Sequence, residues 1–222
     1  MVEILEETTK EPLTLMGRCA GICYNATVND ALLNKCRGRS CLESNHGRVL
    51  EYPQIYMVFS GYSAKVIREF YTHIGGAPTR LQESTRYINL SDFNYIIPPS
   101  IKNNSYAKEI YEDTINTIKE ASSRLQSLGI KNEDVSMLYP LCMESKIVVR
   151  TNLRQLIEMS HQRLCTRAFW EFRNLMFDIR CALSEYSDEW NEILEDYYIP
   201  KCEYLGYCPE ENSCGKKSRR ID

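Results

Sequence analysis

Hydrophobic and polar positions recur with two different periods along this chain. Residues 54–59 are rich in β-branched and aromatic side chains and are followed by a glycine, which predicts a strand. The next segment, 63–73, opens with Ser63, a residue type favoured at helix N-caps, and its apolar residues recur at helical spacing. This pattern predicts a helix that stops at Gly75 and Gly76.

The second half of the chain has mostly helical periodicity. Residues 105–128 form an amphipathic pattern, and Gly129 is a natural C-terminal stop. Residues 152–183 read as one long helical segment, and a short strand at 147–149 precedes it. Residues 80–87 are expected to be a loop or a strand. Helices with a few strands predict an α+β fold.

Composition narrows the class of protein. The chain has 222 residues, of which 43% are hydrophobic and 26% charged, which is typical of one globular domain or two small ones. No apolar run approaches the roughly 20 residues that span a bilayer, and the acidic start lacks a signal pattern. The net charge of −3 is unfavourable for general nucleic-acid binding. We therefore expect a cytoplasmic protein with neither a membrane nor a nucleic-acid partner.

Ten cysteines are an unusual number for such a chain. Without a secretory context, reduced thiols are expected. Three thiolates spaced by six residues near the C-terminus would need a fourth ligand to hold zinc, and they lack the two-residue spacing of a zinc knuckle. No metal is predicted, and the weak candidates are Cys202, Cys208 and Cys214. We expect one domain over 1–200 and a basic, cysteine-containing tail over 201–222.

One candidate site follows the predicted helix 63–73. His73 stands before two glycines, which allow a ligand to approach the backbone closely. Gln82, Ser84 and Arg86 alternate, so in an extended chain they point to one side. An amide, a hydroxyl and a guanidinium there suit a phosphate and a nucleobase edge. The alternative is an ordinary polar turn after a helix.

A second candidate lies on the long helical segment. Arg163 and Arg167 are four residues apart and share a helix face, and Asn152 falls close to the same line. Two arginines on one line can bind phosphates. The alternative is ion pairing, for instance between Arg167 and Glu171. His161 is expected to be a structural or surface histidine and not a catalyst.

Taken in order, these motifs resemble those of the flavin-dependent thymidylate synthases, in the branch seen in clostridia and their phages. The sequence YTHIGGAPTRLQESTRY at 71–87 is similar to the hallmark RHRxxSxNExSxRY. The sequence NLRQLIEMSHQRLCTRAFWE at 152–171 is similar to the family's NxR motif and the helix after it. HGRVLE at 46–51, which alone says little, resembles the flavin loop His-x-Thr-x-x-Glu. The likeness covers about residues 14–215, and the chain has no Walker loop, GxGxxG, GxSxG or HExxH motif.

The resemblance implies roles for individual residues. Those that match flavin-binding positions are His46, Arg48, Glu51, His73, Asn152, Arg154 and Arg167. Those implied to bind dUMP are Arg80, Gln82, Glu83, Ser84, Thr85, Arg86 and Arg163. Arg163 is also the implied catalytic residue, because it would contact the uracil ring as charge develops there.

The sequence departs from the hallmark at several positions. The two arginines that flank the histidine are Thr72 and Ile74 here, and the glutamate is Gln82. A phosphate-binding arginine found elsewhere in the family is replaced by Ser136. Binding of the dUMP phosphate must then use fewer or different cations, and Arg80 is the obvious replacement.

The resemblance implies synthesis of dTMP from dUMP. Methylenetetrahydrofolate would give the carbon, and FAD reduced by NADPH the hydride. It also implies a small mixed or antiparallel sheet like that of thymidylate synthase complementing protein, a homotetramer with shared active sites, and no cysteine nucleophile. Two alternatives stay open. One is a related flavin-dependent pyrimidine methylase or hydroxymethylase, which product mass distinguishes. The other is a non-catalytic nucleotide- or metal-binding protein, which would bind dUMP without flavin reduction.

Overall fold

The computed structural model describes residues 1–75 and 78–220, so the predicted stop at Gly76 lies outside the described residues. The chain divides into two compact units. The first comprises residues 1–58, 73–80 and the chain from 148 onward, and the second comprises 59–72 and 81–147. Within the described residues, no helix combines the length and apolar character needed to cross a membrane.

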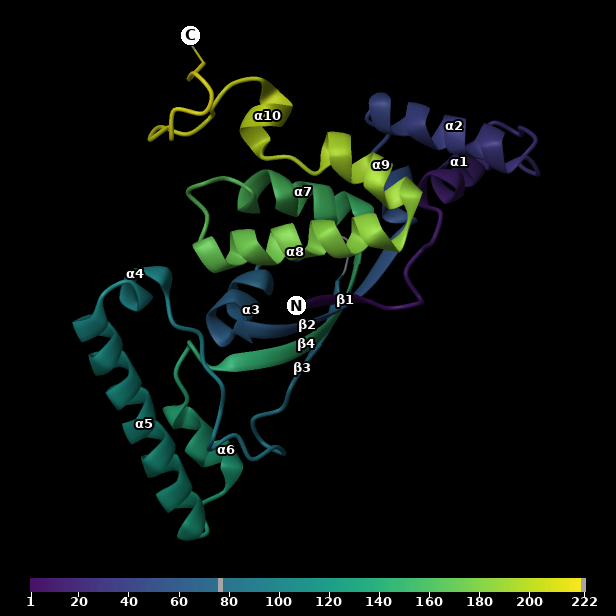
Figure 1. Cartoon of the computed structure of the whole chain (residues 1–222). Helices are drawn as coiled ribbons and strands as arrows, with labels where there is room; N and C mark the ends of the chain where they lie inside the picture. Colours follow the sequence, from purple (N-terminus) through teal and green to yellow (C-terminus); the bar gives the residue numbers. More distant parts are fainter. Residues whose placement is uncertain (76–77, 221–222) are drawn as a thin grey trace. The chain divides into compact units, whose positions relative to one another are not determined.

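A four-stranded sheet has the order β1-β2-β4-β3 and runs through both units. Its strands, seen in Figure 1, are β1 (Val2–Ile4), β2 (Gln54–Ser63), β3 (Thr79–Gln82) and β4 (Glu144–Asn152). Strands β2 and β4 are antiparallel, because Ala64 N–H bonds the Met143 carbonyl at one end and Leu153 N–H bonds the Pro53 carbonyl at the other. The strands predicted at 54–59 and 147–149 are confirmed, and so is the α+β fold.

Two helices of the first unit, α1 (Pro12–Cys23) and α2 (Ala31–Glu43), pack backbone against backbone. A Cβ on Gly17 would stand 1.7 Å from the Asn34 carbonyl oxygen, and one on Gly38 would stand 2.0 Å from the α1 backbone. Only glycine allows this approach. Neither helix is predicted by the hydrophobic pattern, because glycines inside a helix weaken that pattern.

Four further helices complete the first unit. These are α7 (Leu153–Arg163), α8 (Trp170–Tyr186), α9 (Asp188–Tyr197) and α10 (Lys201–Leu205). Helices α7 and α8 lie side by side (Figure 1). Their shared core contains residues that are at most 1% exposed: Leu153, Leu156, Phe172, Met176, Ile179, Trp190, Leu194 and Tyr198. The 3-10 helix η1 (Val49–Glu51) packs against α7.

The single helix predicted over 152–183 is wrong, because the chain leaves the helical path at 164–169. Arg173, in the first turn of α8, donates to the Thr166 carbonyl at 2.7 Å and to the Ala168 carbonyl. The guanidinium thus satisfies carbonyls that a continuous helix would satisfy with its own N–H groups. Arg167 consequently lies in a turn, and the helix face that it was predicted to share with Arg163 does not exist.

The second unit begins with α3 (Ala64–Phe70), which is N-capped as predicted: the Ser63 hydroxyl accepts from Val66 N–H at 3.2 Å. The helix ends at Phe70, earlier than expected, so His73 lies beyond it. The other helical elements are α4 (Pro99–Lys102), α5 (Ser105–Ser127), α6 (Asn132–Val135) and the 3-10 helix η2 (Ser136–Leu138). Helix α5 confirms the prediction at 105–128, and Gly129 follows it with φ +80°.

Candidate functional site

Four side chains of the first unit, which we call the arginine cluster, hold one another in place: His73, Arg80, Arg163 and Phe172. The Arg163 Nε–H donates to His73 Nε2 at 2.9 Å. The Arg163 guanidinium lies over the Phe172 ring, 4.5 Å from its centre, and the His73 ring meets the same phenyl ring edge-on at 5.6 Å. The Arg80 guanidinium donates to the His73 backbone carbonyl. The cluster brings the hallmark histidine together with the predicted catalytic arginine.

His73 is only 7% exposed, and its environment keeps it neutral. Burial, followed by the positive charges of Arg163 and Arg80, lowers the pKa of His73 from 6.5 to about 4. Because Nε2 accepts the hydrogen bond from Arg163, the single proton of the neutral ring must lie on Nδ1. At neutral pH His73 is therefore a fixed acceptor that orients Arg163.

A second contact joins the 46–51 loop to α7. Arg154 donates to Glu51, 103 residues away, at 2.8 Å and to Glu158 at 3.3 Å. A Cβ on Gly47 would stand 3.6 Å from the Arg154 guanidinium carbon, so the arginine lies across this glycine. The Arg154 side chain stays 47% exposed. The two remaining residues predicted from this loop are also exposed: His46 and Arg48.

Two other predicted flavin-binding residues have structural partners. Asn152 is 4% exposed, and its side-chain oxygen caps α7 by accepting from Gln155 N–H at 2.9 Å. Arg167 pairs with Glu210 of the C-terminal tail at 2.5 Å, as the alternative of ion pairing predicted, although the partner named there was Glu171. The flavin contacts predicted for Asn152 and Arg167 stay predictions.

The predicted dUMP-binding segment, 82–86, belongs to the second unit. Gln82 ends β3 and donates to the Ser145 hydroxyl at 2.9 Å. The Ser84 hydroxyl accepts from Arg86 N–H at 3.2 Å, because the chain turns at 85–87. The extended alternation predicted up to Arg86 is thus wrong beyond Ser84. The turn satisfies a backbone N–H locally, which an isolated strand cannot do.

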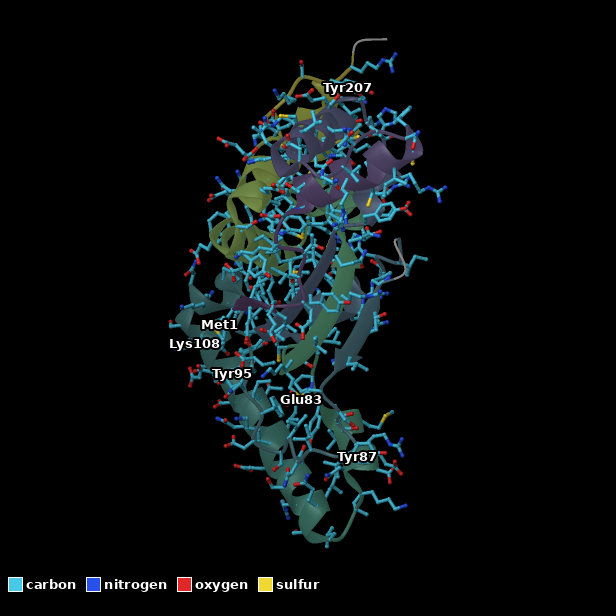
Figure 2. The ribbon with its side chains drawn as sticks, turned by 90° about the vertical axis from the view of Figure 1, so that its right-hand side faces the viewer. Met1, Glu83, Tyr87, Tyr95, Lys108 and Tyr207 are labelled. Carbon is cyan, nitrogen blue, oxygen red and sulfur yellow. The ribbon has the colours of Figure 1, made fainter. Side chains whose placement is uncertain are left out.

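Arg86 itself is 63% exposed and donates through Nε to Glu133 at 3.0 Å. Glu83 holds the segment to the sheet, since its N–H bonds the Lys146 carbonyl at 2.8 Å. Thr85 is half-buried at the start of the turn. Figure 2 labels Glu83 and Tyr87, which mark this stretch. The roles predicted for these side chains toward dUMP stay predictions.

The positions that lack the hallmark arginines hold short or apolar side chains. The Thr72 hydroxyl donates to the Glu69 carbonyl at 2.7 Å, and the Ser136 hydroxyl donates to the Glu133 carbonyl at 2.8 Å. Ile74 is 77% exposed. Arg80, the predicted replacement, is half-buried in the arginine cluster.

A cavity of about 440 Å³ lies in the first unit, between the end of α7, the 164–169 loop and the tail; we call it the tail cavity. Its charged lining residues are Arg163, Arg167, Lys201, Glu210 and Lys217. Its thiols are Cys165, Cys202, Cys208 and Cys214. Within the described residues, no three His, Cys, Asp or Glu side chains are placed to hold a metal ion. Arg163 belongs both to the arginine cluster and to the wall of this cavity.

Sequence reasoning missed Phe172, Gln155 and the tail lysines. Phe172 sits beside the Trp-Glu motif, and its aromatic character next to two arginines was a usable signal. Gln155 stands against Gly75, where an added Cβ would lie 1.9 Å from the Gln155 side-chain oxygen. The close approach predicted at this glycine is therefore made by a side chain of α7.

The sequence is similar to known proteins along nearly its whole length. A family model described as thymidylate synthase complementing protein matches residues 4–202. A flavin-dependent thymidylate synthase of Nitratidesulfovibrio vulgaris is 30% identical over 240 residues, which cover 97% of this chain and 94% of the relative. One of Clostridium tetani is 26% identical over 237 residues, which cover 96% and 92%.

Two solved structures share the fold. Thymidylate synthase X of Helicobacter pylori, determined with FAD and dUMP, aligns with a TM-score of 0.68 and 16% identity over 88% of this chain and 99% of that one. PolB of Streptomyces cacaoi, a UMP/dUMP methylase bound with 5-Br dUMP, aligns with a TM-score of 0.73 and 14% identity over 89% and 95%. At such identities the likeness shows the fold alone.

Proposed function

Since the chain belongs to the flavin-dependent thymidylate synthase family, whose members are FAD-dependent methyltransferases, we propose that it converts dUMP to dTMP. Methylenetetrahydrofolate is the carbon donor, and FAD reduced by NADPH carries the hydride. The observation that carries this proposal is the bond from Arg163 to His73, which unites two separate sequence motifs in one cluster. We also propose that residues 1–200 form the catalytic domain, and that the protein acts in the cytoplasm as a homotetramer with shared sites.

Arg163 is the residue that stabilises the negative charge developing on the substrate in this reaction. C5 of uracil acts as the nucleophile toward the folate methylene, and negative charge develops on the pyrimidine ring. A fixed cation beside the ring stabilises that charge, and removing one such donor typically costs about 100- to 1,000-fold in rate. The Nε bond to His73 and the face-on contact with Phe172 fix the plane of the guanidinium before substrate binds. Less reorganisation is then needed during the reaction.

The first unit carries groups that fit a flavin dinucleotide. Arg154 presents a half-exposed guanidinium across Gly47, a position with no side chain to obstruct a ligand, and Arg48 is an exposed cation on the same loop. Cations beside open backbone suit a pyrophosphate. The residues that would hold FAD are His46, Arg48, Glu51, His73, Asn152, Arg154 and Arg167. When bound and reduced, FAD supplies the hydride that completes the methyl group.

The second unit carries the groups proposed for dUMP. Gln82 and Ser84 offer an amide and a hydroxyl for the nucleotide, and Arg86 offers a largely exposed guanidinium for its phosphate. Glu83 and Thr85 flank these groups. Arg80, which belongs to the first unit, is also proposed to bind dUMP. Because Arg86 already pairs with Glu133, phosphate must displace a carboxylate there.

The test is turnover by purified protein. With dUMP, methylenetetrahydrofolate and NADPH, we expect a flavin spectrum that bleaches on reduction and a product heavier than dUMP by one CH2 group. Arg163→Ala should lose about 100-fold or more in turnover. The matched control is Arg18→Ala, an exposed arginine on α1, which should retain full activity.

UMP is assayed in parallel, because the fold is shared with a UMP/dUMP methylase. A hydroxymethyl product would support the related pyrimidine hydroxymethylase. Binding of dUMP with no flavin reduction by NADPH would support a non-catalytic homologue. Unchanged turnover in Arg163→Ala would refute the role given to this arginine.

A further inference from the structure

The C-terminal tail, residues 201–220, is a folded part of the first unit. Within the tail, Cys208 N–H bonds the Ser218 carbonyl at 2.8 Å, and Lys217 pairs with Glu203 at 2.9 Å. Toward the rest of the unit, Tyr204 stacks on the His161 ring at 4.7 Å. The Glu210 carboxylate adds the ion pair to the 164–169 loop described above. The segment, marked by Tyr207 in Figure 2, is thus anchored over the end of α7.

Nearly all of this tail lies beyond the residues that the family model matches, which end at 202. The tail nevertheless supplies much of the wall of the tail cavity, including Lys217, Glu210 and three of the four thiols. The catalytic arginine proposed above, Arg163, also lines this cavity, at the end of α7. The tail therefore borders the chamber in which Arg163 would act.

The charge of this lining is strongly unbalanced. Four cations face a single carboxylate, Glu210, and one further acid, Glu203, pairs with Lys217 from beside the cavity. Burial and the positive charge of Lys201 both lower the pKa of His161, which is consistent with a positive potential there. A volume of about 440 Å³ is within the usual range for a small-molecule site. A cavity of this size and charge suits an anionic group.

Thiols are also potential metal ligands, so a metal ion is the other occupant to consider for this cavity. Four cysteines line it, but three ligand side chains are nowhere brought together among residues 1–75 and 78–220. The surrounding cations would also repel a divalent metal ion. Two of the lining cations have a carboxylate partner, since Arg167 pairs with Glu210 and Lys217 pairs with Glu203.

We propose that the tail cavity binds the phosphate or carboxylate group of a reaction partner, and that Lys201 and Lys217 supply its charge. This inference rests on the proposed function, since the anion belongs to a molecule that reacts beside Arg163. Two such molecules carry anions for which no site is proposed above: the folate with its glutamyl carboxylates, and NADPH with its 2′-phosphate. The phosphate of dUMP is assigned to Arg86, so dUMP serves as a comparison. The chemistry is shared, and the experiment separates the sources.

The experiment compares the wild-type protein with Lys201→Ala, Lys217→Ala and the double variant. Equilibrium binding is measured for dUMP against deoxyuridine, for a triglutamyl against a monoglutamyl folate, and for NADPH against NADH. Hydrogen bonds to charged groups contribute enough that the double variant should bind either the triglutamyl folate or NADPH at least tenfold more weakly. Its affinity for the paired ligand should fall less, because NADH lacks the 2′-phosphate and the monoglutamyl folate carries fewer carboxylates. In turnover assays the KM of that partner should rise while kcat is retained.

Lys216→Ala is the matched control, because Lys216 is adjacent, pairs with the same Glu203 at 3.5 Å and is absent from the cavity lining. Equal binding of the folate and of NADPH by the double variant and the wild type would overturn the proposal. An equal loss in Lys216→Ala would also overturn it, since that loss would reflect general surface charge. Binding needs no turnover, so a protein that bound its anion through these lysines without making dTMP would refute the proposed function alone.

Discussion

His73 provides a direct test of the arginine cluster, because its depressed pKa must make folding depend on pH. In the unfolded chain the histidine takes up a proton near pH 6.5, whereas in the folded protein it stays neutral down to about pH 4. Between these values the unfolded state binds one more proton, so stability decreases as pH falls. The full contribution, lost below about pH 4, is about 3 kcal/mol, and about 2 kcal/mol of it is lost by about pH 5.

The variant that isolates this effect is His73→Gln, because a glutamine oxygen can still accept from the Arg163 Nε–H but does not titrate in this range. Urea unfolding at about pH 7.5 and about pH 5, at one protein concentration, gives the loss of stability for each protein. Wild type should lose about 2 kcal/mol more than the variant. His161, whose pKa is also lowered by burial, contributes equally to both proteins and cancels.

The carboxyl groups with depressed pKa values, Asp92, Glu192 and Glu203, lose their stabilising charge only as pH falls through the acid range, and they too cancel in the comparison. NMR gives a second measurement. The chain has three histidines, and the ring signal that disappears in His73→Gln should titrate with a midpoint of about 4. Equal pH dependence in both proteins, or a midpoint near the ordinary value, would refute the proposed environment of His73.

Further substitutions probe other contacts of the candidate site. Phe172→Leu should cost about 1–2 kcal/mol in urea unfolding and lower kcat further than that loss explains, since Arg163 loses its ring support. Gly75→Ala should lower turnover because its Cβ would collide with the Gln155 oxygen, and Gln155→Ala should restore part of it in a double-mutant cycle. Glu51→Gln should change stability by less than about 1 kcal/mol yet lower flavin retention in gel filtration, whereas Glu158→Gln should retain the flavin. Glu133→Gln should tighten dUMP binding by up to about fivefold in calorimetry, because Arg86 loses its competing carboxylate; unchanged affinity would argue that Arg86 does not bind the phosphate.

Local sequence patterns predicted the elements with strong periodicity and clear stops. Helix α5 was predicted because its apolar stripe ends at a glycine with positive φ, and α3 because Ser63 is its cap. The break between α7 and α8 could not be predicted, since it contains neither proline nor glycine. It depends on Arg173, whose side chain binds two carbonyls of the turn only once both helices are packed. The hydrophobic periodicity of the sequence does not reveal that contact.

The candidate site depends on contacts between residues that are far apart in the sequence. The Glu51–Arg154 and His73–Arg163 contacts join residues that are 103 and 90 positions apart. No spacing rule relates such residues, so composition and periodicity alone left each as a surface or structural side chain. The motif resemblance predicted that these four residues serve one function. In the structure they form two pairs within the first unit.

The cysteines stand out in the sequence, whereas the arginines and lysines carry the charge of the cavity in the structure. Ten thiols attracted attention by number, yet four of them line a cavity whose charge comes from arginines and lysines. A positive potential in a cavity favours both the ionisation of a thiol and the binding of an anion. A thiolate and a bound anion would therefore compete for the same positive charges. The Thr166 hydroxyl and the Lys216 backbone lower the pKa of the Cys214 thiol, and a thiolate there would weaken the attraction of the cavity for an anion. An anion bound at Lys217, as proposed above, and a thiolate at Cys214 would repel each other, so anion binding should raise the pKa of this thiol.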